Sequence, residues 1–206
     1  MVDLSLKIHL RVIMGKDLSE MTLEELWKLF PIILREHSSE YKEWYIKEKE
    51  NIEKAVGENT IERINHIGSS AVEGLIAKPT VDILLEVDCN TDINNLKLRL
   101  ENAGWRLMSF EKEPDLKMSF NKGYTPDGFS EKVFHLHVRF LGDWDELYFR
   151  DYLMIHEEVA NKYGELKQKL KKQYEHNRDG YTEAKTEFIK KWTKQARKEF
   201  PKRYLP

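Results

Sequence analysis

The sequence predicts an α+β fold in which a mixed β-sheet is flanked by helices and followed by a C-terminal helical hairpin. Two observations carry this prediction. Runs of strand length, TVDILLEV at 80–87 and VFHLHVRF at 133–140, stand between segments whose apolar residues recur at helical spacing. Every segment after Trp144 has helical periodicity without an intervening strand pattern. This order of elements is typical of a sheet with helices packed around it.

The composition is that of one folded domain. Of the 206 residues, 40% are hydrophobic and 11% aromatic, which is enough to form a core and excludes a disordered chain. We expect a single domain over 1–206, with an N-terminal extension at 1–37 and C-terminal helices at 144–200. Apolar runs fall far short of the ~20 residues that cross a bilayer, and scattered charges interrupt the N-terminus. Cys89 is the only cysteine, so an internal disulfide is excluded. Together these features lead us to expect a cytoplasmic protein that does not contact a membrane.

The charge is uneven although the net charge is only −2. From Ala160 to the end, 14 Lys and Arg residues stand against 6 Asp and Glu residues. This asymmetry fits contact with a phosphate-bearing partner, and it equally fits a solvated pair of Lys-rich helices. Nucleic acid is not an expected partner, because the whole chain is slightly negative and contains no motif that reads RNA or DNA.

The first third of the chain alternates between strand and helix signals. Apolar and polar residues alternate over 4–12, which predicts a strand. A capping box at Thr22 opens a helix that extends to Leu34, and Pro31 is expected to kink or break it. Tyr41, Trp44, Tyr45 and Ile52 form a stripe that predicts a helix over 38–56. Further elements are predicted as a strand at 60–67, a short helix at 70–75 and a buried central strand at 80–87.

The remaining elements follow from periodicity and glycine stops. An amphipathic helix over 92–103 ends at Gly104. KGYTPDGFSEK, at 122–132, has the glycines and proline of a loop. The other predicted elements are strands at 105–111, 116–121 and 133–140 and helices at 144–157, 157–176 and 180–199, the last capped near Asp179-Gly180.

Polar residues that could carry chemistry gather between 66 and 87. Gly68-Ser69-Ser70 lies where a strand turns into a helix, so backbone N–H groups, supplemented by two hydroxyls, could hold a phosphate. An ordinary helix cap would look the same. Lys78 precedes Pro79 and is therefore extended at the mouth of the next strand. Asp82 stands in an apolar strand, where a carboxylate is costly unless it is paired, hydrogen-bonded or bound to a metal.

This segment resembles the nucleotidyltransferase superfamily through its Gly-Ser turn, its Lys-Pro pair and its Asp-bearing strand. Together with three later blocks it resembles the GrpB family over about residues 40–195. The resemblance implies a sheet of nucleotidyltransferase type, binding of a nucleotide or another phosphate-bearing small molecule, and a divalent metal, manganese or magnesium. It also implies Asp82 as the catalytic residue. The four blocks are HIGSSAVEGLIAKPTVDILLEV, HLHV, FRDYLMIHEEVANKYGELK and DGYTEAKTEFI.

The expected metal site departs from the superfamily pattern. Leu84 occupies the position two residues after Asp82 where a second carboxylate is usual, and Glu86 lies about 13 Å along the strand. His135 and His137 share one strand face and could complete a His/His/Asp set, which suits manganese, zinc or iron better than magnesium. Two half-exposed histidines on a solvated face would give the same pattern.

The C-terminal helices supply further candidates for the site. Tyr181 and Lys185 share a helix face, so Lys185 could reach a polyphosphate while Tyr181 stacks on, or hydrogen-bonds to, a base or a sugar. Arg150 and Asp151 are expected to form structural ion pairs instead. Two functional hypotheses remain open: metal-dependent nucleotidyl transfer from a nucleoside triphosphate to an unknown acceptor, and a catalytically silent module that binds a nucleotide or phosphate. Whether the protein is an enzyme therefore stays undecided at this level.

Overall fold

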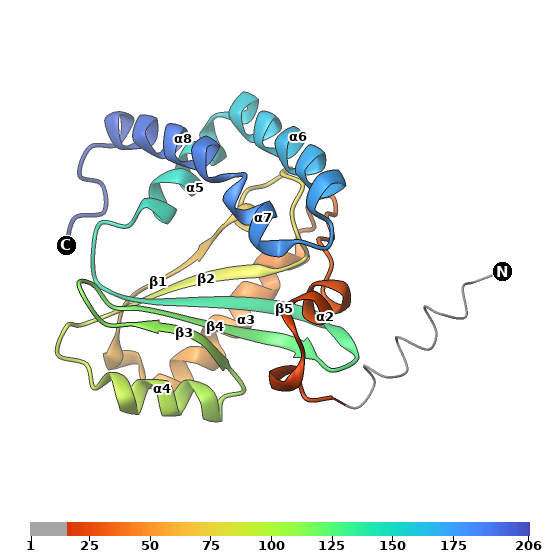
Figure 1. Cartoon of the computed structure of the whole chain (residues 1–206). Helices are drawn as coiled ribbons and strands as arrows, with labels where there is room; N and C mark the ends of the chain where they lie inside the picture. Colours follow the sequence, from red (N-terminus) through yellow and green to blue (C-terminus); the bar gives the residue numbers. More distant parts are fainter. Residues whose placement is uncertain (1–15) are drawn as a thin grey trace.

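Five strands form one mixed sheet in the computed structural model, which describes residues 16–206 (Figure 1). Their spatial order is β1-β2-β5-β4-β3, and only β2 and β5 are parallel. The parallel pair lies centrally because its strands carry nearly continuous apolar residues and are covered on both faces. The strands are β1 (Ile61–Ile67), β2 (Val81–Val87), β3 (Arg106–Glu111), β4 (Lys117–Thr125) and β5 (Gly128–Phe140).

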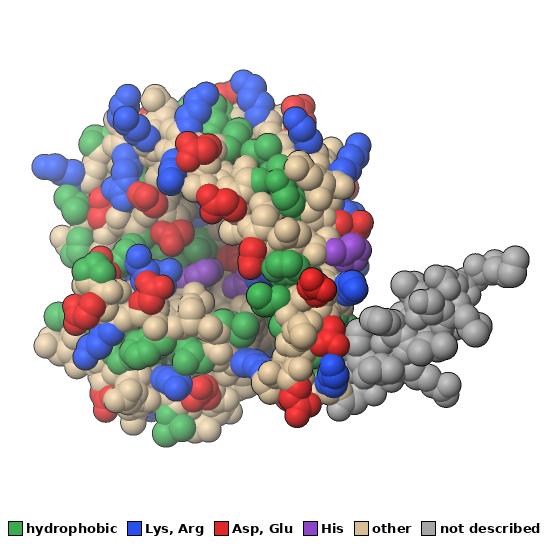
Figure 2. All heavy atoms as spheres, in the orientation of Figure 1, with side chains coloured by type: hydrophobic (Ala, Val, Ile, Leu, Met, Phe, Trp, Pro, Cys, Tyr) green, Lys and Arg blue, Asp and Glu red, His purple; other side chains and the backbone are tan. Residues whose placement is uncertain are grey.

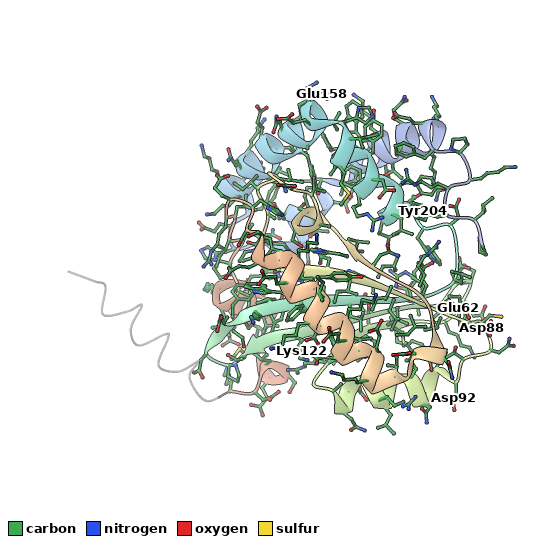
Figure 3. The ribbon with its side chains drawn as sticks, turned by 180° about the vertical axis from the view of Figure 1, so that it is seen from behind. Glu62, Asp88, Asp92, Lys122, Glu158 and Tyr204 are labelled. Carbon is green, nitrogen blue, oxygen red and sulfur yellow. The ribbon has the colours of Figure 1, made fainter. Side chains whose placement is uncertain are left out.

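Helices cover both faces of the sheet. Figure 3 shows α3 running across one face with α4 near it, and Figure 1 shows α5 to α8 over the opposite face. None of the helices in the described part of the chain has the length and apolar character that a membrane crossing requires. The helices are α2 (Leu23–Leu29), α3 (Glu40–Val56), α4 (Ile93–Asn102), α5 (Asp145–Ile155), α6 (Glu157–Tyr174), α7 (Arg178–Glu183) and α8 (Thr186–Glu199).

Strand alternation divides the central strands into an apolar face and a polar face. The odd positions of β2, from Val81 to Val87, pack with Leu136 and Val138 of β5 into the core beneath α3 and α4. Asp82, His135, His137 and Arg139 consequently point to the opposite side, where residues of α5 to α8 lie near them. The sheet therefore presents its polar residues to the C-terminal helices, as the alternation of VFHLHVRF predicts.

Several boundaries differ from the sequence prediction. The first helix ends at Leu29, because Pro31 has no N–H to continue it, and Arg35 pairs with Ala77 as an isolated bridge instead. The expected helix at 70–75 is only a 3-10 turn, η3 (Ser69–Ala71). The strand expected at 4–12 lies outside the described residues. Two further short 3-10 turns are η1 (Leu18–Glu20) and η2 (Glu58–Thr60).

The segment 122–132 is a hairpin and not the loop that its glycines and proline suggested. A register shift between Lys122 and Tyr124 lets β4 continue to Thr125, where two residues turn the chain into β5. The helix expected at 180–199 is also divided. Asn177 caps α7 two residues earlier by accepting from Gly180 N, and a tight turn from Thr182 O to Lys185 N separates α7 from α8.

Candidate functional site

A cavity of about 850 Å³ opens between the polar face of the sheet and α5 to α8. Figure 2 shows the hollow at the centre of one side of the molecule, with histidine and charged side chains at its mouth. The turn after β1, the first half of β2, the middle of β5 and one side each of α6, α7 and α8 line it. All residues expected from sequence to form the site line this cavity: Gly68, Ser69, Ser70, Lys78, Asp82, His135, His137, Tyr181 and Lys185.

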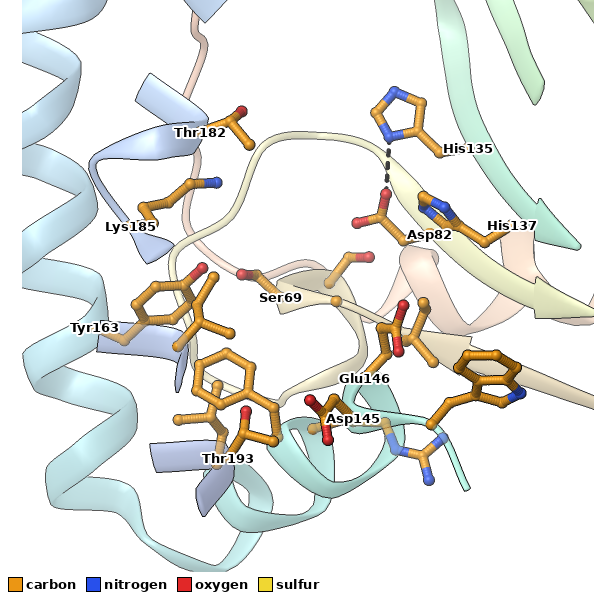
Figure 4. A pocket seen from close by; sticks show the side chains of 18 of the residues that line it. Ser69, Asp82, His135, His137, Asp145, Glu146, Tyr163, Thr182, Lys185 and Thr193 are labelled. Atoms are coloured by element: carbon orange, nitrogen blue, oxygen red, sulfur yellow. Dashed lines mark hydrogen bonds and ion pairs between the residues drawn. The ribbon is translucent and has the colours of Figure 1, made fainter. Parts of the chain in front are cut away.

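Asp82 and His135 form a hydrogen-bonded pair across the parallel strands. Their Cα positions are in register, and His135 Nδ1 lies 2.8 Å from Asp82 Oδ1 (Figure 4). On the other side of the ring, Nε2 lies 2.8 Å from the Tyr124 hydroxyl and 3.2 Å from Arg178 Nη2. Because a guanidinium can only donate, Nε2 accepts and Nδ1 carries the proton that is donated to Asp82. The tautomer of His135 is therefore determined by its neighbours.

The same neighbours set the charges of this pair. Burial lowers the pKa of His135 to about 4, against the opposing effect of Asp82, so the imidazole is neutral near pH 7. Burial alone would raise the pKa of Asp82, but the hydrogen bond from His135 and the charge of Lys78 outweigh it and hold that pKa well below its usual range. The pair is thus an ionised carboxylate held by a neutral, oriented imidazole.

The Gly68-Ser69-Ser70 turn contacts Asp82 directly. Gly68 has a φ of 72°, and a Cβ at this position would overlap Asp82 Oδ2. The two serines are engaged as well: Ser70 Oγ lies 3.0 Å from His66 Nε2, and Ser69 Oγ accepts a 3.0 Å hydrogen bond from Lys167 Nζ. Glycine here permits close approach of a carboxylate, whereas the sequence suggested close approach of a phosphate.

Three lysines surround Asp82, of which Lys167 is buried and Lys78 and Lys185 are partly buried. Burial, reinforced by neighbouring cations, lowers the pKa of Lys78 to about 7, that of Lys167 to about 7 and that of Lys185 to about 8. Arg178 adds a fourth cation from the start of α7. We call the space that these four side chains and Asp82 enclose the basic cavity.

Sequence reasoning did not single out Lys167 and Arg178. Lys167 shares the buried stripe of α6 with Tyr163 and Leu170 and belongs to one of the family-like blocks, so a charged residue on an apolar stripe was the available signal. Arg178 lies one residue before another block and had no such signal.

Two of the lysines lack a polar partner. Within residues 16–206, neither Lys78 nor Lys185 makes a side-chain hydrogen bond or ion pair, although Lys185 Nζ lies 4.5 Å from the centroid of the Tyr181 ring. Lys167, by contrast, donates to Ser69 and to the carbonyl of Ile76. An unpaired buried cation is costly, so the basic cavity is built to receive negative charge.

Tyr181 lines the cavity as expected, but its ring is buried. Its side chain is 1% exposed and packs against Ile32 and Leu170, with Lys185 over one face of the ring. The ring is therefore enclosed by protein, so this position favours a hydrogen bond from the Tyr181 hydroxyl to a ligand over stacking. Its buried hydroxyl has no hydrogen-bond partner in the described structure, nor has Thr193 Oγ1, and both residues line the cavity.

Four other carboxylates, those of Glu86, Asp143, Asp145 and Asp151, are paired with arginines. Glu86 is fully buried and accepts two hydrogen bonds from Arg63 and one from Gly142 N. Arg150 donates twice to Asp151, at 2.8 and 2.7 Å, which agrees with the structural ion pair expected from sequence. At the outer end of the cavity, Asp143 and Asp145 pair with Arg197.

The donor set does not fit the metal ion that the resemblance implies. His135 has both ring nitrogens engaged, Leu84 supplies no carboxylate, and Glu86 is bound to Arg63. Asp82 and His137 are the remaining pair of the expected ligands, so a magnesium or manganese ion would need the phosphates of a substrate to complete its coordination. Across the described residues, no group of three His, Cys, Asp or Glu side chains is arranged to hold a metal.

Comparison with known proteins identifies one matching family model and several proteins with similar sequences. The family model described as GrpB protein matches residues 31–195. The Glutamate-rich protein GrpB of Alkalihalophilus pseudofirmus is 35% identical over 162 residues, which cover 77% of this chain and 91% of that protein. A UPF0157 protein of Pseudomonas aeruginosa is 39% identical over 127 residues, 61% of this chain and 52% of that protein. The chain thus spans about half the length of this second relative.

One solved structure is of a protein with the same family name. The conserved protein GrpB from Enterococcus faecalis superposes with a TM-score of 0.69 at 27% identity, covering 82% of this chain and 99% of that chain. A structure of the RNA terminal uridylyl transferase Cid1 matches with a TM-score of only 0.42 at 12% identity, covering 74% of this chain and 45% of that chain. On the extent of the family match and the identity to its relatives, this chain belongs to the GrpB family.

Proposed function

We propose that the basic cavity binds a phosphate-bearing small molecule, specifically a nucleoside polyphosphate, and does so without a metal ion. The observation that carries this proposal is the convergence of Lys78, Lys167, Lys185 and Arg178 on one cavity, with lysine pKa values lowered by burial. A bound polyanion would restore full charge to these lysines and supply the partners that Lys78 and Lys185 lack.

The arrangement of the cations indicates a chain of phosphates and not a single one. Lys167 is anchored to the η3 turn through Ser69, whereas Lys78 arises from the segment before β2 and Lys185 from the junction of α7 and α8. Cations that approach from three different elements can contact successive groups of an extended anion. The backbone N–H groups at the start of the η3 turn add donors beside Lys167.

Nucleotidyl transfer assisted by a divalent metal, manganese or magnesium, is a second candidate. It is favoured by one observation: ionised Asp82 and His137 both line the cavity beside Ser69, and the His137 ring makes no hydrogen bond within residues 16–206. The incomplete donor set argues against it, and it requires ligands that the substrate itself would have to supply.

Calorimetric titration with ATP and with inorganic tripolyphosphate, each in EDTA, tests the proposal. We expect both to bind the wild-type protein and neither to bind Lys185→Met, while Lys194→Met, on an exposed position of α8, binds as the wild type does. Absence of binding in EDTA would overturn metal-free binding. Binding that appears only with manganese, together with transfer of label from [α-³²P]ATP, would establish the second candidate instead.

A further inference from the structure

A second pocket, walled by aromatic side chains, adjoins the basic cavity. Phe30, Tyr124 and Phe129 pack edge to face, with ring centroids 4.9 to 5.3 Å apart, around a space of about 480 Å³. This volume lies within the roughly 300–1,000 Å³ of small-molecule pockets. We call it the aromatic pocket. Phe30 comes from the end of α2 and the other two rings from the β4–β5 hairpin, beside which Figure 1 shows α2.

The two pockets share part of their walls. Lys78, Thr80 and Arg178 line both of them. Arg178 lies with its guanidinium carbon 5.6 Å from the centroid of the Tyr124 ring while its Nη2 lies 3.2 Å from His135. The two pockets therefore adjoin at Lys78, Thr80 and Arg178.

The chemistry of the second pocket suits a flat, weakly polar group. Its rings hold one another in place edge to face, so the wall is formed before any ligand binds. Exposed Ser130 and Glu131 supply polar atoms at the rim. The buried ring of Tyr181 cannot take part in stacking within the basic cavity, which leaves the aromatic pocket as the adjoining place with suitable surfaces.

We infer that the aromatic pocket holds the nucleobase of the nucleotide whose phosphates occupy the basic cavity, with Arg178 lying between base and phosphates. This inference rests on the proposed function and adds to it the class of ligand, because a base subsite selects a nucleotide over inorganic polyphosphate or a phosphosugar. Stacking on aromatic side chains tolerates different bases, so the pocket discriminates nucleotides from other polyanions more strongly than it discriminates among nucleotides.

The test compares ATP and tripolyphosphate on three proteins in EDTA: wild type, Phe129→Ala and Phe110→Ala. Phe110, on β3, is 47% exposed and lines neither pocket, so it is the matched control. We expect ATP to bind the wild type about 5- to 150-fold more tightly than tripolyphosphate does, the range that base stacking provides. Phe129→Ala should lose most of this advantage without weakening tripolyphosphate, and Phe110→Ala should keep it.

A second variant, Phe129→Trp, should retain the preference for ATP. The melting temperatures of Phe129→Trp and Phe129→Ala are measured to check that both proteins are folded. Equal affinities of ATP and tripolyphosphate for the wild type would overturn the base subsite while leaving the proposed function intact. A preference for ATP that survives in Phe129→Ala would place the base elsewhere and also overturn it. If neither ligand binds the wild type, the proposed function fails and this inference fails with it.

Discussion

His135 donates its Nδ1 proton to Asp82 Oδ1 over 2.8 Å, between two parallel strands whose residues are in register at this point. Through this hydrogen bond the imidazole orients the Asp82 carboxylate and stabilises its charge. It keeps Asp82 oriented and ionised at the wall of a cavity that otherwise carries positive charge. The carboxylate that the family resemblance assigns to a metal lies here among Lys78, Lys167 and Lys185, and its charge raises the pKa of each of them against the effect of burial.

Asp82→Asn is expected to strengthen metal-free binding of tripolyphosphate at pH 6. The amide oxygen can still accept from His135, while the negative charge that repels the ligand is removed. At pH 6 the lysines with pKa values of about 7, 7 and 8 are mostly protonated in the wild type, and in Asp82→Asn the bound anion favours their protonated form. Two charges roughly 8 Å apart at an effective dielectric constant of about 20 repel by about 2 kcal/mol, up to about 30-fold in affinity. Calorimetry in EDTA measures this, and weaker binding by Asp82→Asn would show that the carboxylate helps to hold the ligand.

Ligand affinity is expected to fall as the pH rises from 7 to 9. The anion binds the protonated lysines, and Lys78 and Lys167 lose their protons near pH 7 and Lys185 near pH 8 in the ligand-free protein. Binding should therefore raise these pKa values and take up protons. Titrations at pH 7.5 in buffers of different ionisation enthalpy measure the uptake directly. An affinity that stays constant between pH 7 and 9, with no proton uptake, would contradict a role for these lysines.

Lys185→Met is expected to stabilise the ligand-free protein near pH 7 by about 1–3 kcal/mol, because it removes a partly buried cation that has no polar partner. The pKa of Lys185 is lowered to about 8 from the ordinary lysine value of 10.5. The unfolded chain thus binds more protons between these values, so the destabilisation is complete below about pH 8 and disappears as the pH approaches 10.5. Urea unfolding at pH 7 and pH 10 should show a large difference from wild type at the lower pH and little at the higher. Lys194→Met serves as the exposed control at both.

Gly68→Ala is expected to destabilise the protein more than Gly74→Ala does. Both glycines have a positive φ, 72° and 74°, but a Cβ at Gly68 overlaps Asp82 Oδ2 whereas nothing lies within 4 Å of one at Gly74. Backbone strain of about 1–3 kcal/mol is common to both, and the clash is additional at Gly68. Adding Asp82→Ala to Gly68→Ala should recover part of the extra loss, which a double-mutant cycle of unfolding free energies measures. Equal losses at the two glycines would refute the close contact between Gly68 and Asp82.

Local patterns predicted much of the sheet and the longer helices. The alternation in TVDILLEV and VFHLHVRF placed Asp82, His135 and His137 on one side of the sheet, and their neighbours in the core, because side chains alternate with period two along any strand. The helices near 38–56, 92–103 and 157–176 also followed from spacing alone. The hairpin at 122–132 did not, since glycine and proline serve a bulge and a turn as readily as a loop.

The sequence by itself determined that this chain is an α+β protein of the GrpB family, with Gly68, Ser69, Lys78 and Asp82 close together in one segment. Only the tertiary structure decided what these residues do for one another. Lys167 and Arg178 reach the site from helices about 90 residues further along the chain and give it its charge, and packing against Ile32 closes the face of Tyr181. The burial, charge state and hydrogen-bond partners of each side chain depend on which distant segments of the chain pack together. The spacing of residues along the sequence does not show which segments do so.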